Sequence, residues 1–451
     1  MSPARRAALD ALVSIDRGRS TLPDAMERAR RTLDDPRDRA LVLELVAGTL
    51  RWRNALDAVL TERSRRPVDE LDPVVRAILR LSAFQLLNLD RVPAHAIVDD
   101  AVELSRAWKR TRATGFVNAV LRSLARQPGT DALPDAPGPG GSRAAQLLYL
   151  SVTLSHPGWL VERWLDRFGY ESTEAWCRFN NEPPAIVVRA RPGAEAALEH
   201  LVDDPASGVR RSPVLAHVGI VGTGGLGRLP SAIRDQVVTQ DEGSQLLAHA
   251  TPLPPAGRVL DLCAAPGNKT TILAERAGAG VRIVAADHRP ARVATLRATL
   301  AERALSIPVV RLDARAPLPF GPVFDTVLVD APCSGLGTLR REPDLKWRRQ
   351  PSDLRAFATV QASMLRSAAA IVGEGGCILY ATCSSEPDEN DEVVDAFLRT
   401  HSGFAREPLS LPPPVLGPVA FIESDGCLRT RPFRDGLDAY FAAVLVRRRA
   451  A

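Results

Sequence analysis

Two cysteines of this 451-residue chain follow apolar runs that predict β-strands. Cys383 comes directly after the run 380–382, and Cys333 comes three residues after Asp330, which ends the run 325–330. A cysteine at a strand end is more often a small buried hydrophobic residue. Two cysteines and a carboxylate at one edge of a sheet instead indicate a thiolate that attacks an electron-poor ring.

Such a nucleophile must be ionised, and a thiol with an ordinary pKa of ~8.5 needs positive charge or ordered donors nearby. Arg340, Arg341 and Lys346 follow Cys333 closely and are the predicted source of that charge. Lysine is rare, because it occurs only at positions 109, 269 and 346. We therefore interpret Lys269 and Lys346 as positions where a slim point charge is needed.

The second candidate site is the loop Cys263-Ala-Ala-Pro-Gly-Asn-Lys269, between a predicted strand and a predicted helix. Such a loop offers backbone N–H groups to a ligand at the carboxyl edge of an open sheet. It is not a Walker loop, because Asn268 separates Gly267 from Lys269, and its single glycine excludes the dinucleotide fingerprint. A nucleotide-like ligand without a phosphate cradle remains, and S-adenosylmethionine fits that description.

Asp287 ends the next apolar run and lies 20 residues after Gly267 (287 − 267). A carboxylate at this strand end is placed to accept hydrogen bonds from ribose hydroxyls. The alternative is a helix N-cap before Arg289-Pro290, and by itself the position supports both interpretations equally. Its pairing with the glycine loop favours the ribose interpretation.

These residues need an α/β domain to bring them together. From about residue 256 onward, apolar runs that predict strands alternate with helical patterns, which indicates a mostly parallel sheet covered on both faces. The predicted strands are 259–262, 281–286, 307–312, 323–329 and 377–381, and the predicted helices are 270–277, 290–304, 352–372 and 389–400. Residues 426–430 and 440–447 predict an antiparallel hairpin that finishes the sheet.

The preceding sequence predicts three further segments. Residues 1–128 show helical periodicity and predict an all-α bundle, whose basic face at 115–126 does not by itself indicate RNA binding. Residues 129–143 are rich in proline and glycine and predict a linker. Residues 144–240 predict a small α+β subdomain that we expect to bind RNA, and residues 241–451 predict the α/β domain.

Composition limits the class of protein. The length predicts two or three domains, and 45% apolar with 25% charged residues is typical of a soluble globular protein. No apolar run approaches the ~18 residues of a membrane span, and no signal core follows the N-terminus, so we expect a cytoplasmic protein without a membrane partner. The six cysteines form no Cys-x-x-Cys pair, which argues against disulfides and a metal site. The net charge of +5 only hints at an anionic partner.

Several motifs together resemble the RNA cytosine-carbon-5 methyltransferases, and most closely the bacterial 16S rRNA family called RsmB, Sun or Fmu. In the α/β domain these are Asp261-Leu-Cys-Ala-Ala-Pro-Gly-Asn-Lys-Thr270, Asp330-Ala-Pro-Cys-Ser-Gly335, Pro343-Asp-Leu-Lys-Trp347 and Tyr380-Ala-Thr-Cys-Ser384. In the helical segment, residues 38–51, 91–97 and 115–122 resemble the NusB-like RNA-binding domain of that family. The resemblance spans nearly the whole chain.

This resemblance implies a Rossmann-like fold that transfers methyl groups from S-adenosylmethionine to small-subunit rRNA, in a chain expected to be monomeric. It implies that Cys383 adds to carbon 6 of cytosine, that Asp330 hydrogen-bonds the ring edge, and that Cys333 assists the final elimination. It also implies that Asp287 contacts the cofactor ribose and that Asp313 lies near the adenine. The implied cofactor-binding residues are Cys263, Ala264, Ala265, Pro266, Gly267, Asn268, Lys269, Asp287, Asp313 and Asp330.

The chain departs from the family pattern at two places. Asn268 stands where the family has a second glycine, and we expect asparagine to tolerate a positive φ there. Asp438-Ala-Tyr-Phe441 replaces the usual Asp-Gly-Phe-Phe.

Rival interpretations are a non-catalytic RNA-binding or antitermination factor, a tRNA methyltransferase and a DNA methyltransferase. The two cysteines with Asp330 and Lys269 argue against the first, the NusB-like segment against the second, and the Thr-Cys strand end against the third.

Overall fold

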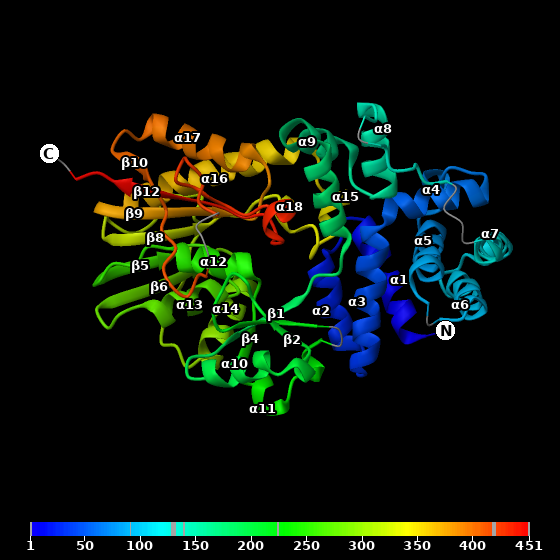
Figure 1. The fold of residues 1–451 in the computed structure, drawn as a ribbon, viewed down its shortest axis with the longest axis horizontal. Helices are drawn as coiled ribbons and strands as arrows, with labels where there is room; N and C mark the ends of the chain where they lie inside the picture. Colours follow the sequence, from blue (N-terminus) through cyan, green and yellow to red (C-terminus); the bar gives the residue numbers. More distant parts are fainter. Residues whose placement is uncertain are drawn as a thin grey trace. The chain divides into compact units, whose positions relative to one another are not determined.

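The computed structural model describes residues 2–90, 92–127, 132–138, 140–222, 225–416 and 421–449 (Figure 1). The chain divides into two compact units. Unit 1 contains residues 1–183 and 339–349, and unit 2 contains residues 184–338 and 350–451. The predicted boundaries at 128, 143 and 240 were placed where the sequence pattern changes, whereas these two units group residues that contact one another, so the two divisions differ. Residues 129–131 and 139 of the predicted linker lie outside the described residues.

Unit 1 begins with a helical bundle. Its helices are α1 (Pro3–Asp16), α2 (Leu22–Thr32), α3 (Pro36–Arg51), α4 (Arg53–Ser64), α5 (Pro73–Asn88), α6 (Ala94–Ala107) and α7 (Thr114–Arg126). They confirm the all-α bundle that the helical periodicity of residues 1–128 predicts. Helix α2 carries little apolar sequence, and a capping box between Thr21 and Asp24 defines its start.

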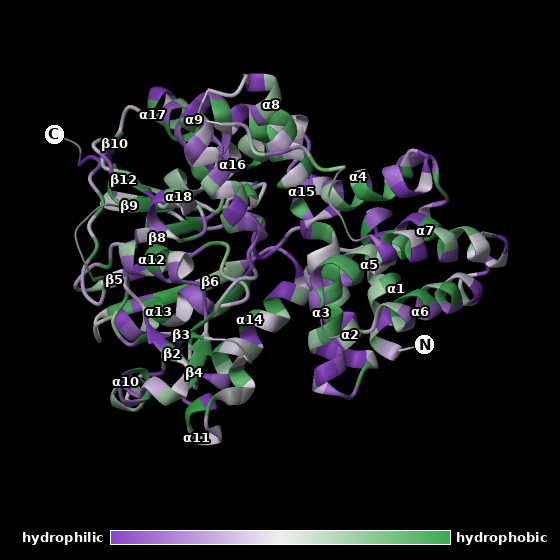
Figure 2. Cartoon of the chain, turned by 45° about the vertical axis from the view of Figure 1, so that its right-hand side comes forward, coloured by the Kyte–Doolittle hydropathy of each residue, from purple (hydrophilic) through white to green (hydrophobic). Residues whose placement is uncertain are grey.

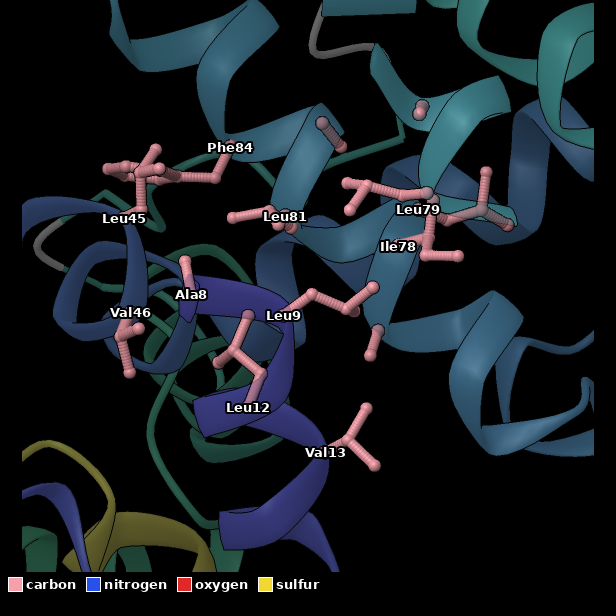
Figure 3. Packing of buried hydrophobic residues seen from close by; sticks show 14 of the residues in the cluster. Ala8, Leu9, Leu12, Val13, Leu45, Val46, Ile78, Leu79, Leu81 and Phe84 are labelled. Carbon is pink, nitrogen blue, oxygen red and sulfur yellow. The ribbon is translucent and has the colours of Figure 1, made fainter. Parts of the chain in front are cut away.

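Helices α1, α3 and α5 share the core of this bundle, and Figure 3 shows their apolar side chains pointing toward one another. The ring of Phe84 from α5 lies directly on the backbone of α3 at Gly48. A Cβ atom at Gly48 would come within 2.0 Å of the ring atom Cζ, so only glycine permits this packing.

Unit 1 continues past residue 143 with α8 (Arg143–Leu148), the π-helical turn η3 (Tyr149–Thr153) and α9 (Gly158–Asn181). Asn54 at the start of α4 binds this region, because its backbone N–H donates to Ser155 Oγ at 2.9 Å and its Nδ2 donates to Ser151 O at 3.0 Å. These bonds explain why residues 144–181 group with the bundle. The later segment 339–349, which includes α15 (Leu345–Arg348), also belongs to unit 1.

Unit 2 begins with a small antiparallel sheet of order β2-β3-β1-β4. Its strands are β1 (Ile186–Ala190), β2 (Val209–Arg211), β3 (Val218–Val221) and β4 (Val237–Thr239), accompanied by α10 (Glu195–Asp203) and α11 (Ser231–Arg234). Arg189 of β1 joins this sheet to the main domain, since its guanidinium donates to Thr271 Oγ1 and pairs with Glu275.

The main sheet of unit 2 has the order β10-β12-β9-β8-β5-β6-β7, with β11 paired to β12. Strands β5, β6, β7, β8 and β9 are parallel, and β12 is antiparallel to β9 and to β10. The strands are β5 (Gly257–Asp261), β6 (Val281–Asp287), β7 (Val309–Arg311), β8 (Phe324–Asp330), β9 (Val372–Thr382), β10 (Phe404–Glu407), β11 (Leu428–Arg429) and β12 (Phe441–Arg447). The predicted α/β fold is confirmed.

Helices cover both faces of this sheet. On one face lie α16 (Pro351–Ile371) and α17 (Asp391–Thr400), and on the other lie α12 (Glu242–Ala250) and α13 (Asn268–Arg276). Helix α14 (Pro290–Glu302) packs its leucines against the β5–α13 loop. The covered strands are mostly hydrophobic in Figure 2, as a doubly covered sheet requires. Among the described residues, every helix is too short or too polar to cross a membrane.

Candidate active site

The carboxyl ends of the parallel strands bring most of the predicted site residues to one edge of the main sheet. The loop 262–267 follows β5, Asp287 ends β6 and Asp330 ends β8. Asp313 lies two residues after β7, and Cys383 directly follows β9. This is the edge at which open α/β sheets bind ligands.

Cys333 and Cys383 lie side by side, with their sulfur atoms 3.3 Å apart. Both side chains are half-buried. Register places Asp330 beside Ala381, and the backbone N–H of Gly337 donates to Cys383 O at 2.9 Å, so the two loops run together. The hydrogen bond with Cys383, burial, and the negative charges of Cys383 and Glu389 hold the pKa of the Cys333 thiol well above its ordinary value. Cys333 therefore keeps its proton at neutral pH.

Lys269 provides a positive charge at this edge. Its Nζ donates to Asp330 Oδ2 at 2.7 Å, and both side chains are largely buried. Burial lowers the pKa of Lys269, but the charge of Asp330, the hydrogen bond to it and the charge of Cys383 together raise the pKa above its ordinary value. Lys269 is thus an ammonium group within the field of the cysteine pair.

Lys346 and Arg340 do not have the predicted role beside Cys333. Lys346 is fully buried in unit 1, where its Nζ donates to the carbonyl oxygens of Arg51 and Ser155 and to Asn181 Oδ1. Burial holds the pKa of Lys346 well below its ordinary value, which disfavours the charged form. The guanidinium of Arg340 lies over the ring of Phe179 and donates to Pro183 O, also inside unit 1.

The β5–α13 loop turns at Gly267, whose φ of 112° is open to glycine and strained for other residues. A Cβ atom there would come within 3.1 Å of Leu296 and 3.2 Å of Thr299. Asn268 is already the first residue of α13 and is absent from the residues with positive φ. The expectation that Asn268 must tolerate a positive φ is therefore wrong, because Gly267 alone makes the turn.

Asp287 is buried against this loop. Its Oδ2 accepts hydrogen bonds from Ala265 N at 3.3 Å and from Arg292 Nε at 3.1 Å, while its Oδ1 accepts from Arg289 N at 3.3 Å. The bond from Arg289 N is a local turn contact and not the helix cap proposed as the alternative, because the N-cap residue of α14 is Arg289 and no side chain caps it. The bond from Ala265 N ties the same carboxylate to the β5–α13 loop, so Asp287 holds both this loop and the turn before α14.

Asp313 is more exposed, and its carboxylate forms a two-pronged contact with the guanidinium of Arg315. That hydrogen bond is the main reason why the pKa of Asp313 lies well below its ordinary value. The carboxylate is thus held as an anion beside β7.

The segment Asp438-Ala-Tyr-Phe441 contacts the cysteine loops through its backbone. Ala439 N donates to Gly337 O at 2.9 Å, and a Cβ atom at Gly337 would come within 2.0 Å of Ala439 O. The backbone N–H of Gly337 also donates to Cys383 O, so Gly337 links this segment to the Cys383 loop. Its side-chain differences from the family pattern leave these backbone contacts in place.

Sequence reasoning missed the buried polar groups beneath the site. Asp261 is buried at the end of β5 and accepts a hydrogen bond from Thr270 Oγ1 at 2.6 Å, and burial raises the pKa of Asp261 to about 7. Glu389 is buried beneath the cysteine loops and accepts hydrogen bonds from Ser334 and Ser384. Glu389 lies in the polar run 387–390, which is typical of an exposed helix start, so no local signal marks it.

The six cysteines are free thiols, and the described residues contain no group of three or more His, Cys, Asp or Glu side chains able to hold a metal ion.

Comparison with known proteins decides the family. Residues 251–446 match the family described as 16S rRNA methyltransferase RsmB/F, and residues 2–126 match the NusB family. Ribosomal RNA small subunit methyltransferase B of Pseudomonas putida KT2440 is 34% identical over 412 residues, covering 90% of this chain and 91% of the relative. The chain belongs to the RsmB/F family of rRNA methyltransferases.

Two further proteins are similar over nearly the full length. A Mycobacterium tuberculosis CDC 1551 protein named as a methyltransferase is 37% identical over 465 residues, covering 99% of this chain and 97% of the relative. The crystal structure of the protein PH0851 has a TM-score of 0.76 and 24% identity, and the match covers 99% of both chains. This structural similarity supports the fold, and the family assignment rests on the sequence relatives.

Proposed function

We propose that this RsmB/F family member transfers a methyl group from S-adenosylmethionine to carbon 5 of a cytosine in 16S rRNA, through a covalent adduct between a cysteine and carbon 6. The observation that carries this proposal is the 3.3 Å separation of the Cys333 and Cys383 sulfurs beside the Lys269–Asp330 ion pair. A pair of thiols suits a reaction that must both form and break one sulfur–carbon bond.

Cys383 is the proposed nucleophile. Its thiolate forms a bond to carbon 6, and the electrons of the 5,6 double bond make carbon 5 able to attack the methyl group, whose bond to the donor's sulfonium sulfur breaks and leaves a neutral thioether. After transfer, carbon 5 loses its proton to water, the double bond forms again, and the sulfur–carbon bond breaks. Cys333 keeps its proton, so it can donate a hydrogen bond to the sulfur of Cys383 as that sulfur leaves.

Asp330 and Lys269 are the proposed contacts to the ring edge and to the charge that develops there. Asp330 has a fixed position because it ends β8 and binds Lys269 Nζ. An ammonium held in a largely buried site stabilises nearby negative charge more than it would in water. Lys269 thus places a positive charge within the field of Cys383, the role first assigned to Arg340, Arg341 and Lys346.

The residues at the ends of β5, β6 and β7 fit an adenosine ligand. Asp287 retains acceptor capacity, because a carboxylate offers about four lone-pair sites and three donors of the chain contact it. We propose that Asp287 binds the ribose, that Asp313 lies near the adenine, and that residues 263–269 line the methionine end. S-adenosylmethionine supplies the methyl group when bound.

The RNA partner is proposed to contact the helical part of the chain. The match to the NusB family covers α1 to α7, and the Pseudomonas putida relative is by name a methyltransferase of small-subunit rRNA. The α7 face carries Arg122 and Arg126 with exposed side chains. Changing both to glutamate should weaken RNA binding and reduce its salt dependence, because each phosphate contact releases counterions. Unchanged affinity and salt slope would exclude this face.

The test of the proposed function uses the full-length protein, methyl-labelled S-adenosylmethionine and three RNAs: 16S rRNA, 23S rRNA and bulk tRNA. Label should enter 16S rRNA alone, and bisulfite sequencing should locate it at a cytosine. Label in tRNA alone would support the tRNA methyltransferase alternative. Binding without any labelling would support the non-catalytic RNA-binding alternative.

A further inference from the structure

One buried carboxylate joins the two loops that carry the cysteines. Glu389 is the last residue of the 3-10 turn η7 (Pro387–Glu389) and is inaccessible to solvent. Its Oε2 accepts hydrogen bonds from the hydroxyls of Ser334 and Ser384, each at 2.5 Å, and its Oε1 accepts the backbone N–H of Ser334 at 2.8 Å. Each serine directly follows one of the cysteines.

Glu389 is itself held in place from two further elements. Gln361 of α16 donates from Nε2 to Glu389 Oε1 at 3.0 Å and to Pro332 O at 3.1 Å. The hydroxyl of Tyr380 in β9 donates to Glu389 O at 2.5 Å. The carboxylate therefore connects α16 with both cysteine loops, and the backbone carbonyl of Glu389 adds a contact to β9.

We propose that Glu389 is a positioning residue that sets the spacing of the Cys333 and Cys383 sulfurs for the cytosine reaction. This inference rests on the proposed function. Glu389 does not touch the reacting atoms in the proposed mechanism, and it acts through Ser334 and Ser384. A carboxylate suits this place because its two oxygens accept all four donors at once.

The chemistry of the site predicts which substitution is tolerated. In Glu389→Gln, the amide oxygen can accept from Ser334 N and Gln361, and the amide nitrogen can donate to the two serine hydroxyls, which accept as well as donate. Glu389→Ala leaves those donors without an acceptor in a buried place. Burial raises the pKa of Glu389, against the hydrogen bonds from Ser334, Ser384 and Gln361 that lower it. Loss of the negative charge is therefore a smaller change than loss of the acceptors.

The direct test needs neither RNA nor methyl transfer. Phenylarsine oxide condenses with two thiols, forming two arsenic–sulfur bonds and releasing one water, and the chelate resists a monothiol wash only when both sulfurs are close. The full-length protein should retain the arsenical, and Cys383→Ala should not. Glu389→Ala should lose it at least about tenfold faster than wild type, because the effective concentration of the second thiol falls. Glu389→Gln should retain it nearly as well as wild type.

Two further variants make the comparison specific. Ser384→Ala removes one arm of the connection with little change in packing and should show an intermediate rate. Glu242→Ala is the matched control, because Glu242 of α12 is also a buried glutamate and accepts a hydrogen bond from the hydroxyl of Ser212. Wild-type retention in Glu389→Ala, or equal loss in Glu242→Ala, would overturn the proposal. Retention of the arsenical does not depend on catalysis. The result can therefore be interpreted even if the proposed methyl transfer is not observed.

Kinetics separate positioning from general folding. Glu389→Ala should lower kcat by about 10²-fold, the scale expected for a misplaced reacting group, while the affinity for S-adenosylmethionine stays at the wild-type value. Glu389→Gln should restore most of kcat. An equal loss of cofactor affinity in Glu389→Ala, or a Glu389→Gln variant as slow as Glu389→Ala, would contradict a role in spacing the sulfurs.

Discussion

Lys269 Nζ donates a 2.7 Å hydrogen bond to Asp330 Oδ2, which joins the β5–α13 loop to the end of β8. The pair thus connects the proposed cofactor loop with the proposed cytosine contact. Burial lowers the pKa of Lys269, but Asp330 and Cys383 raise it, so the ammonium also contributes to the electrostatics around the proposed nucleophile, Cys383. One lysine therefore serves three parts of the site.

Lys269→Met should lower the single-turnover rate by about 10²–10³-fold, the loss expected when one preorganised electrostatic contact is removed. Asp330→Asn should cause a similar loss, and the double variant should be slowed by less than the product of both effects. Lys109→Met, at an exposed lysine of unit 1, is the matched control when RNA is saturating. Fully multiplicative losses would mean that the two residues act independently.

Asp287→Ala should weaken binding of S-adenosylmethionine by roughly 2–4 kcal/mol, because two hydrogen bonds to a charged group are lost. The same carboxylate accepts from Ala265 N, so Asp287→Asn is needed as a variant that keeps the packing of the loop. Titration calorimetry gives both affinities, and thermal melting of the ligand-free variants gives the cost to the fold. An unchanged affinity in Asp287→Ala would remove Asp287 from the cofactor site.

The buried His249 should make the free energy of unfolding of unit 2 depend on pH. Burial, with the charges of Arg276 and Arg189, lowers the pKa of this histidine to about 4 in the folded chain from 6.5. Between these values the unfolded chain binds more protons, so stability is lost as the pH falls from above 6.5 toward 4, by up to about 3 kcal/mol.

Urea unfolding followed at several pH values measures this loss. His249→Leu should flatten the acid side of the profile, whereas His95→Leu, at an exposed position, should leave the slope as in wild type. An equally steep profile in His249→Leu would assign the pH dependence to other groups.

The positions of Asp287, Asp330 and Cys383 were predictable because they follow apolar runs. A parallel sheet brings the ends of such runs to one edge, so local pattern and topology suffice. The same reasoning predicted the glycine turn at Gly267. It failed for Asn268, since the family pattern does not say which of two adjacent residues has the positive φ.

The roles of Glu389 and Lys346 were not predictable from local sequence. Glu389 is buried by Ser334 and Gln361, which are 55 and 28 residues away along the chain. Lys346 follows the cysteine motif closely in sequence, yet residues 339–349 group with unit 1, where Asn181 and two carbonyl oxygens bind its ammonium. Proximity in sequence therefore predicted that Lys346 supplies a positive charge to Cys333, whereas its ammonium group is bound inside unit 1.

The proposed covalent cycle assigns different steps to the two cysteines. Cys383→Ala removes the nucleophile, so it should bind RNA only reversibly and form no methylated product. Cys333→Ala removes the thiol that assists the departure of the Cys383 sulfur, so it should attack and transfer methyl and then remain attached to RNA. Ser367→Ala, which removes a hydroxyl that donates to Ala316 O away from the cysteines, is a suitable control.

Denaturing gel electrophoresis of each variant with labelled 16S rRNA and S-adenosylmethionine is the most direct measurement. We expect a slow, protease-sensitive RNA band for Cys333→Ala, and none for Cys383→Ala or for the Cys333→Ala/Cys383→Ala double variant. A slow band for Cys383→Ala and none for Cys333→Ala would reverse the two assignments. The absence of the band from both single variants would contradict the covalent mechanism itself.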